Sequence, residues 1–154
     1  MAVYLMQHGI PVSKAEDPER PLSAKGMKDI ENLAEFLQKR GITVKDVYHS
    51  GKRRAKETAE IMSARVAPGT EPRERRGLSP LDDVGDIVDQ INKGNGGILI
   101  AGHLPHLSKL TSLLVVGNES VPVVSFQQGG LVCLERLDDE GWAVAWMLVP
   151  EIIG

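Results

Sequence analysis

The sequence predicts an α/β fold: a three-layer α/β/α sandwich with a mostly parallel sheet and a C-terminal hairpin. Short apolar runs, typical of buried strands, alternate along the chain with longer segments whose apolar residues recur at helical spacing. This alternation favours a parallel sheet that carries helices on both faces. The last two strand-like runs, residues 131–137 and 142–149, flank an Asp-Asp-Glu-Gly turn signal at residues 138–141 and therefore predict a closing hairpin.

The first half of the chain supplies two strand–helix units. Residues 2–6 form a short apolar run, as expected of a strand buried on both faces. A helix is expected from a cap at Ser23 to about Arg40. A second strand is expected over residues 44–48, and a second helix from Gly51 to about Arg65. The apolar face of the first helix comprises Met27, Ile30, Leu33, Ala34 and Leu37.

The second half adds two more helices with a strand between them. Residues 79–82 (Ser-Pro-Leu-Asp) predict a helix start, with a cap, a proline at the first helical position and an acid at the third. That helix is expected to end at residues 94–97 (Gly-Asn-Gly-Gly). Residues 98–101 then form a buried strand, and Pro105 opens a helix that continues through Leu114.

Length, composition and charge limit the class of protein. A chain of 154 residues suits one domain, residues 1–154. Hydrophobic residues make up 42% and charged residues 25%, which predicts an ordinary buried core rather than disorder. The net charge is −3, and without a basic excess we expect no nucleic-acid partner. The basic cluster at residues 73–76 is interpreted as a solvated, partly compensated turn.

Cysteine usage and hydropathy bear on the compartment. Cys133 is the only cysteine, so no internal disulfide is expected, in keeping with a reducing cytoplasm. The apolar run after Met1 is short and lacks a basic leader, so it does not resemble a signal peptide. No apolar stretch approaches the roughly 20 residues that a membrane span needs. We therefore expect a cytoplasmic protein without membrane association.

Polar side chains follow three of the predicted strands. His8, Ser50 and His103 each come just after a strand ends. Open parallel sheets place ligands at the carboxyl ends of their strands. We therefore expect these three side chains, although far apart in the sequence, to meet along one rim of the sheet.

His8 is the candidate nucleophile at this rim. An imidazole can attack phosphorus when one ring nitrogen is free and the other is held by a hydrogen bond. Gly9 would let the backbone pass close to a ligand. Taken alone, a His-Gly pair is more often structural than catalytic, so a structural role for His8 is the alternative.

The segment from Ser50 to Thr58 lies where a strand turns into a helix. Free backbone N–H groups at a helix start favour anions, and arginine adds planar donors that match phosphate oxygens. Helical spacing turns Arg53 and Arg54 about 100° apart, so we expect only one of them to point into the site. The alternative is a solvated basic helix start.

His103 offers a second imidazole, which can donate a hydrogen bond to a phosphoryl oxygen. His106 lies close behind it, a spacing that raises the possibility of a metal pair. No convincing third ligand accompanies the two histidines, and Pro105 interrupts the segment. We therefore expect no metal site and no cofactor, with His106 packed in the interior or facing solvent.

Taken together in order, these segments resemble the histidine phosphatase superfamily, and within it the short, SixA-like phosphohistidine phosphatases. The similarity extends along nearly the whole chain. Each motif alone is loose, but the four in this order are fairly specific. The matching segments are Gln7-His8-Gly9, Arg20-Pro21-Leu22-Ser23-Ala24-Lys25-Gly26, Ser50 with Arg54, Ala55 and Thr58, and Gly102-His103-Leu104-Pro105.

The resemblance implies a phosphoglycerate-mutase-like fold and a role for each matched position. His8 would take the phosphoryl group as a phosphohistidine intermediate. Arg54 and His103 would bind the phosphoryl oxygens and stabilise the charge of the transition state. Arg20 would lie near the entrance. The expected phosphate-binding set is Gln7, Gly9, Arg20, Ser50 and His103.

Gln7 departs from the family pattern, which has arginine at this position. Glutamine can donate hydrogen bonds but brings no charge, a difference that weakens phosphate stabilisation by about 1 kcal/mol or more. Arg20, Lys52 or Arg53 can restore the missing charge. The substitution leaves open whether the protein is fully active.

Gly77 is the second departure, because many members of the family carry a glutamate there that serves as proton donor. Asp82 and Asp83 are nearby substitutes. Carboxylates at the start of a helix more often cap it, and capping is the preferred interpretation of both residues.

The leading hypothesis is a phosphatase with a histidine nucleophile that removes phosphate from phosphohistidine on a protein. The alternative is a catalytically weak pseudo-phosphatase that binds phosphorylated partners, which Gln7 favours. A third hypothesis is a phosphatase or mutase for a phosphate-bearing small molecule. The short chain, which resembles family members without a lid, argues against that third hypothesis.

Overall fold

The computed structural model describes residues 1–138 and 141–154, and its centre is a six-stranded sheet in the order β3-β2-β4-β1-β5-β6. β4 pairs in parallel with both β1 and β2, and β3 pairs in parallel with β2. β5 runs antiparallel to β1 and to β6. The predicted mostly parallel sheet with a C-terminal hairpin is confirmed. The strands are β1 (Val3–Gln7), β2 (Asp46–His49), β3 (Arg73–Glu74), β4 (Ile98–Gly102), β5 (Leu131–Arg136) and β6 (Trp142–Leu148).

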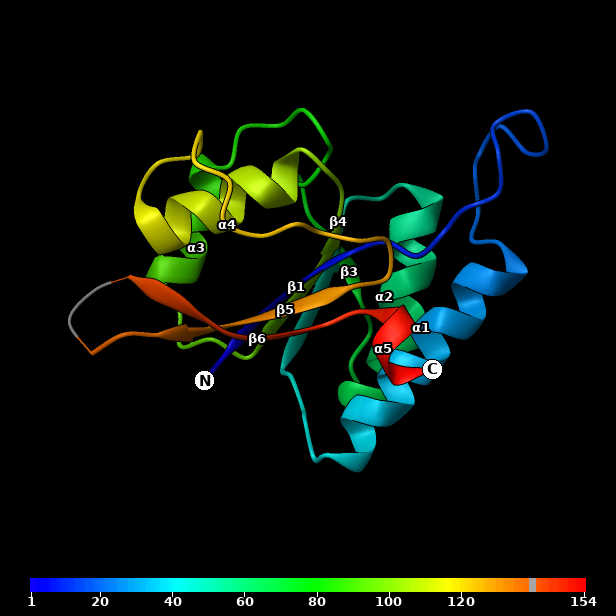
Figure 1. The fold of residues 1–154 in the computed structure, drawn as a ribbon, viewed down its shortest axis with the longest axis horizontal. Helices are drawn as coiled ribbons and strands as arrows, with labels where there is room; N and C mark the ends of the chain where they lie inside the picture. Colours follow the sequence, from blue (N-terminus) through cyan, green and yellow to red (C-terminus); the bar gives the residue numbers. More distant parts are fainter. Residues whose placement is uncertain (139–140) are drawn as a thin grey trace.

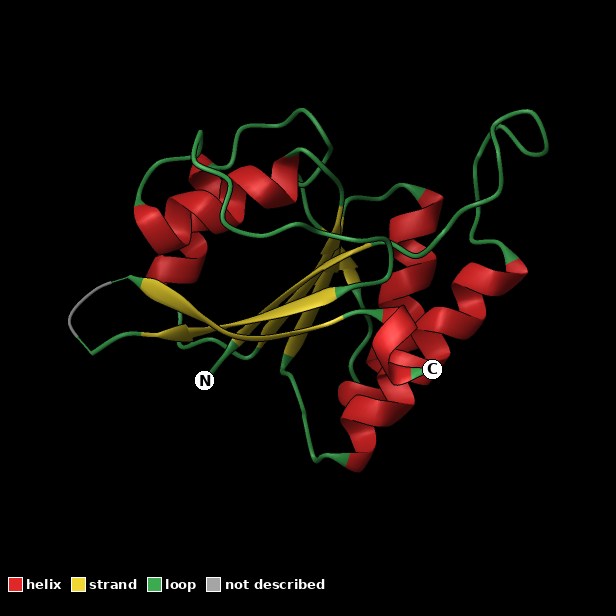
Figure 2. Cartoon of the chain, viewed as in Figure 1, coloured by secondary structure: helices red, strands yellow, loops and turns green. Residues whose placement is uncertain are grey.

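Helices cover both faces of the sheet, as the alternation of elements predicts (Figures 1 and 2). One face carries α1 (Ala24–Lys39), α2 (Arg53–Val66) and the short α5 (Pro150–Ile153). The other carries α3 (Gly85–Lys93) and α4 (His106–Val116). None of these helices, within the described residues, is long and apolar enough to cross a membrane.

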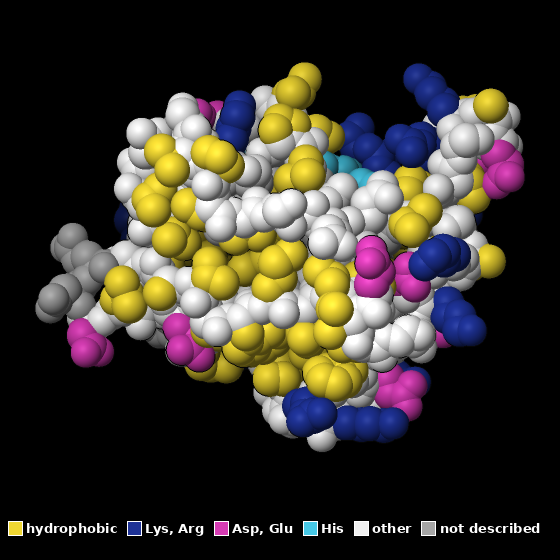
Figure 3. Space-filling view, in the orientation of Figure 1, with side chains coloured by type: hydrophobic (Ala, Val, Ile, Leu, Met, Phe, Trp, Pro, Cys, Tyr) yellow, Lys and Arg dark blue, Asp and Glu magenta, His cyan; other side chains and the backbone are white. Residues whose placement is uncertain are grey.

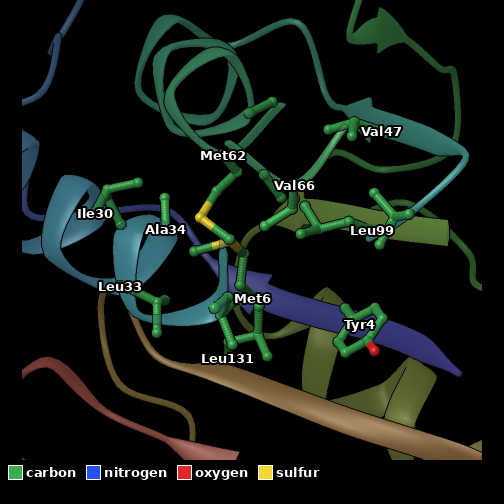
Figure 4. Close-up of a cluster of buried hydrophobic side chains, with 14 of the residues drawn as sticks. Tyr4, Met6, Ile30, Leu33, Ala34, Val47, Met62, Val66, Leu99 and Leu131 are labelled. Atoms are coloured by element: carbon green, nitrogen blue, oxygen red, sulfur yellow. The ribbon is translucent and has the colours of Figure 1, made fainter. Parts of the chain in front are cut away.

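Two apolar clusters form the core, one on each face of the sheet. β1 contributes to both, because successive side chains of a strand point to opposite faces. Tyr4 and Met6 pack against α1 and α2 in the cluster of Figure 4, whereas Val3 and Leu5 pack against α3 and α4. A fully buried side chain such as Leu5 contributes roughly 2–3 kcal/mol to the free energy of unfolding. The two clusters fix β1, and with it the position of His8.

The prediction of a helix start at Ser79 is wrong, because α3 begins only at Gly85. The polar side chains of this segment satisfy nearby backbone groups in turns instead of capping a helix. The Asp82 carboxylate accepts a hydrogen bond from Ser79 N at 2.9 Å, and the Asp83 carboxylate accepts one from Gly85 N at 3.0 Å. Such local bonds offer the backbone an alternative to the helix.

The basic cluster at residues 73–76 does not form the predicted turn throughout. Its first two residues are β3, the short edge strand beside β2. Arg73 is fixed by an ion pair with Asp46 at 2.9 Å and lies over the Tyr48 ring, 5.2 Å from the ring centroid. α5 has no counterpart among the predicted elements. Within the expected turn at residues 138–141, residues 139–140 lie outside the described part of the chain.

Candidate active site

The carboxyl ends of β1, β4 and β2 bring His8, His103 and Ser50 together, at the rim where sequence reasoning expects them. The ring centroids of His8 and His103 are 5.1 Å apart. Ser50 Oγ lies 2.6 Å from His103 Nε2. Figure 3 shows histidine side chains in a hollow of the surface with lysine and arginine side chains beside it.

The hydrogen bonds of His8 define which ring nitrogen is free to react. Nδ1 lies 2.7 Å from the Gly9 carbonyl oxygen. A carbonyl oxygen only accepts, so Nδ1 carries the hydrogen and Nε2 carries the lone pair. The Arg54 guanidinium donates from Nε to that Nε2 at 3.3 Å. The ring is therefore held in the tautomer whose Nε2 faces a cation.

Burial keeps both rim histidines neutral. Loss of hydration is the main reason why the pKa of His8 falls from its usual 6.5 to about 4. The hydrogen bond to Gly9 raises this pKa, whereas the charges of Arg54 and Arg20 lower it further. Burial likewise lowers the pKa of His103 to about 3, with His8 and Arg54 adding to the effect. At neutral pH the His8 lone pair is available.

The first turn of α2 separates its two arginines. Arg54 points to His8, whereas Arg53 points away and pairs with Glu57 and Glu19, each at 3.2 Å. The charge of Arg53 is therefore compensated and does not replace an arginine missing beside His8. Burial lowers the pKa of Arg54, and the charge of Arg20 adds to this effect, but guanidinium groups stay protonated in proteins.

Thr58 belongs to this site although the expected set of site residues omits it. Its fully buried hydroxyl accepts a hydrogen bond from Gly9 N at 3.1 Å and donates one to the Arg54 carbonyl oxygen at 2.8 Å. It thus fixes the backbone after His8 against the helix that carries Arg54. The signal for it was present in the sequence, because Thr58 stands one helical turn after Arg54.

The other expected binding residues surround this centre. Gln7 ends β1, and its buried Oε1 has no hydrogen-bond partner among the described residues. Gly9 approaches α1 closely, since a Cβ there would lie 3.0 Å from Ile30 Cγ1 and 3.1 Å from the Gly26 carbonyl oxygen. A side chain at this position would therefore crowd α1, which favours glycine here. Arg20 lies near enough for its charge to lower the pKa of His8 and that of Arg54.

The remaining polar candidates, His106, Asp82 and Asp83, make packing or local backbone contacts. His106 is 1% exposed, and burial lowers its pKa, so it packs in the interior rather than facing solvent. Asp82 and Asp83 both make the local backbone contacts described above, and they line a polar cavity together with Ser50 and Gly77. Across the described ranges, no group of three or more His, Cys, Asp or Glu side chains could hold a metal ion.

The depressed pKa of His8 makes a prediction about pH. Protonation blocks Nε2, so the ring can act as a nucleophile only above its pKa and loses that capacity as the pH falls through about 4. The unfolded chain takes up this proton near pH 6.5, so folding stability also declines as the pH falls from about 6.5 to about 4. Histidine NMR titration should give His8 a midpoint near 4; a midpoint near 6.5 would contradict the burial of the ring beside Arg54.

Comparison with known proteins gives a consistent family. A model of the histidine phosphatase superfamily (branch 1) matches residues 3–82. The chain is 27% identical to phosphohistidine phosphatase SixA of Escherichia coli, covering 97% of this chain and 94% of that protein. It is 29% identical to an uncharacterised protein of Picosynechococcus, covering 76% of this chain and 74% of that protein.

A solved structure of the protein histidine phosphatase SixA, complexed with tungstate, has the same fold. It matches with a TM-score of 0.84 and 24% identity, and the alignment covers 100% of both chains. The predicted phosphoglycerate-mutase-like α/β fold is therefore confirmed.

Proposed function

Because the chain belongs to the histidine phosphatase superfamily, branch 1, we propose that it removes the phosphoryl group from phosphohistidine on a protein, through an intermediate on His8. The family membership and the similarity to SixA support a phosphatase activity. The observation that carries the proposal is the state of His8: a neutral ring with Nδ1 tied to Gly9 and Nε2 facing the Arg54 guanidinium.

The proposed reaction has two steps at His8 Nε2. In the first, the lone pair forms a bond to phosphorus while the substrate P–N bond breaks, and its electron pair leaves with the substrate imidazole, which takes a proton from solvent. In the second, water attacks phosphorus, and the electron pair of the His8–phosphorus bond returns to Nε2. The products are inorganic phosphate and the neutral His8 of the starting state.

Arg54, His103 and Arg20 bind the phosphoryl oxygens in this account. Arg54 offers the planar donors that suit phosphate, and its contact with His8 puts them next to the reacting nitrogen. The bound anion favours the charged form of His103 and so raises the pKa of that ring, whose Nε2 then donates to a phosphoryl oxygen in place of its contact with Ser50 Oγ. These donors lie where negative charge develops in the transition state, and such electrostatic stabilisation is the largest single contribution to the rate enhancement of many enzymes.

The surroundings of the leaving group favour phosphohistidine over a phosphate ester. Gly77 supplies no acid, and the Asp82 and Asp83 carboxylates already accept hydrogen bonds from backbone N–H groups. An ester needs a strong proton donor because an alkoxide leaves poorly, whereas imidazole leaves phosphorus readily. The name of the E. coli relative, a phosphohistidine phosphatase, supports the same substrate class.

A direct comparison of substrates tests the proposal. The protein is incubated with a phosphohistidine peptide and with a generic phosphate ester, beside the His8→Ala variant as control. We expect the peptide to be the better substrate and the variant to release no phosphate above background. Preference for the ester would identify a small-molecule phosphatase instead, and binding of the peptide without turnover would identify a pseudo-phosphatase.

Gln7 is the residue that favours the pseudo-phosphatase, and its replacement by arginine is informative. Gln7→Arg should raise kcat by roughly tenfold, since about 1.4 kcal/mol of added transition-state stabilisation gives that factor. The guanidinium adds a charge and two aligned donors beside His8. Steady-state kinetics on the phosphohistidine peptide measure the gain.

Arg20→Ala and the double variant complete that measurement, because Arg20 already brings a charge to the site. If Arg20 occupies the space of the new side chain, activity falls in Gln7→Arg and recovers in the double variant. An unchanged rate in Gln7→Arg, with Arg20→Ala also harmless, would show that charge at this rim does not limit catalysis.

A further inference from the structure

The loop between β1 and α1 carries Arg20 back to the site after an excursion into solvent. It projects beyond the body of the molecule as the dark-blue loop of Figure 1. Its two ends are held together at the Pro11–Leu22 bridge and by a hydrogen bond from Val12 N to the Pro21 carbonyl oxygen at 2.8 Å. Arg20 stands in the returning limb, and its Nε donates to the Val12 carbonyl oxygen at 3.2 Å.

The backbone of Arg20 is strained. Its φ is +48°, in the left-handed region that residues other than glycine rarely adopt. Such conformations persist only where the surrounding contacts hold them, and they cluster at functional sites. The contacts that hold this residue therefore set the position of its guanidinium, whose charge acts on His8 and Arg54.

Arg20 itself donates from its N to the Asp17 carbonyl oxygen at 2.9 Å, and Glu57 holds the chain on both sides of it. One carboxylate oxygen accepts a hydrogen bond from Leu22 N at 2.7 Å. The other accepts from Arg53 Nε at 3.2 Å, and Arg53 Nη1 donates in turn to the Glu19 carboxylate at 3.2 Å. The Glu57 side chain thus binds Leu22 directly, and it is linked to Glu19 through Arg53.

The same two turns of α2 carry Arg54 and Thr58, so the fixed parts of the site share one helix. Arg54 contacts His8, and Thr58 holds the backbone of Gly9. Arg20 and Arg54 carry like charges close enough to affect each other, which opposes their approach while no anion is bound. A carboxylate that ties the Arg20 loop to α2 counters this repulsion.

We propose that Glu57 is a positioning residue that holds Arg20 at the phosphoryl site, through Leu22 N directly and through Arg53 and Glu19. This rests on the proposed function, in which Arg20 binds the phosphoryl oxygens. Glu57 touches neither substrate nor His8 in this account. Its effect is to keep Arg20 in place before the substrate binds, so that binding does not have to order the loop.

The test is a double-mutant cycle read out as tungstate affinity, measured by calorimetry, together with kcat and KM for the phosphohistidine peptide. Glu57→Ala should raise the Kd for tungstate by roughly tenfold, the effect of losing one charge-assisted contact. Glu57→Gln should stay within about threefold of the parent, because its carbonyl still accepts from Leu22 N. In the Arg20→Ala background, Glu57→Ala should have no further effect.

Glu35→Ala is the matched control, since Glu35 forms the same i,i+4 type of ion pair with Lys39 on α1, at 3.0 Å, without contacting the loop. It should leave affinity and activity unchanged. If Glu57→Ala does not fold, Arg53→Ala removes the link to Glu19 and the 3.9 Å contact with Asp17 but leaves Glu57 bound to Leu22 N, and it should show a loss of roughly two- to threefold, again absent without the Arg20 side chain.

Two results would overturn the positioning role: an undiminished effect of Glu57→Ala or Arg53→Ala in the Arg20→Ala background, or no effect of either on tungstate affinity. Either result can be interpreted only if the parent protein binds tungstate. A parent protein that neither binds the oxyanion nor hydrolyses the peptide would instead overturn the proposed function, and this inference with it.

Discussion

His8→Ala is expected to lower kcat for a phosphohistidine peptide by roughly 10⁴-fold or more, the scale seen when a nucleophile is removed. The reason is that no other group at the rim is placed to replace it. His103 Nε2 contacts Ser50 Oγ and, once substrate binds, donates to a phosphoryl oxygen, so it has no free lone pair, and its Nδ1 is buried. Phosphate release measured under single-turnover conditions gives the number without interference from product release.

The fold of that variant should survive. His8 lies at the end of β1, and neither apolar cluster includes it. Circular dichroism and thermal unfolding should therefore resemble those of the parent at neutral pH. Tungstate should still bind, because Arg54 and His103 remain. Activity close to that of the parent would remove His8 from the nucleophile role, and an unfolded variant would favour the structural alternative.

Arg54→Ala is expected to lower kcat by roughly 10²- to 10³-fold, the effect of removing one donor from a site where charge develops. Arg54 is the side chain whose contact with His8 Nε2 places a fixed positive charge next to the attacking atom. Arg54→Lys should recover only part of the loss, because an ammonium group lacks the planar pair of donors. Steady-state kinetics on the peptide measure both variants.

Arg65→Ala is the matched control for that experiment. Arg65 lies on the same helix and donates to Gln38 at 2.9 Å, with no contact to the site. Its replacement should leave kcat unchanged. Loss of activity in Arg54→Ala no larger than in Arg65→Ala would contradict the assignment of Arg54 to the transition state.

The sequence predicted the layered fold because its strands are buried on both faces and its helices have one apolar face each. The rim followed from the same reasoning, since the carboxyl ends of parallel strands meet at one edge. The elements that were missed are short. β3 has two residues and α5 has four, which is too few to give a periodic pattern.

The contacts that complete the site could not be predicted from local sequence patterns. Thr58 meets Gly9 across 49 residues, and Glu57 meets Leu22 across 35, so both contacts exist only once the fold brings the segments together. Helical spacing showed that Arg53 and Arg54 point in different directions. It did not show which of them faces His8, because that depends on how α2 packs against β1.

The claim that a phosphoryl group passes through His8 is tested most directly by trapping it there. The protein is mixed with a ³²P-labelled phosphohistidine peptide, quenched within the first turnover, digested and analysed by mass spectrometry. We expect a labelled fragment carrying phosphate on His8, stable to base and labile to acid, and no such label in His8→Ala. A peptide that is hydrolysed at full rate with no label on His8, or with the label on His103, would contradict it.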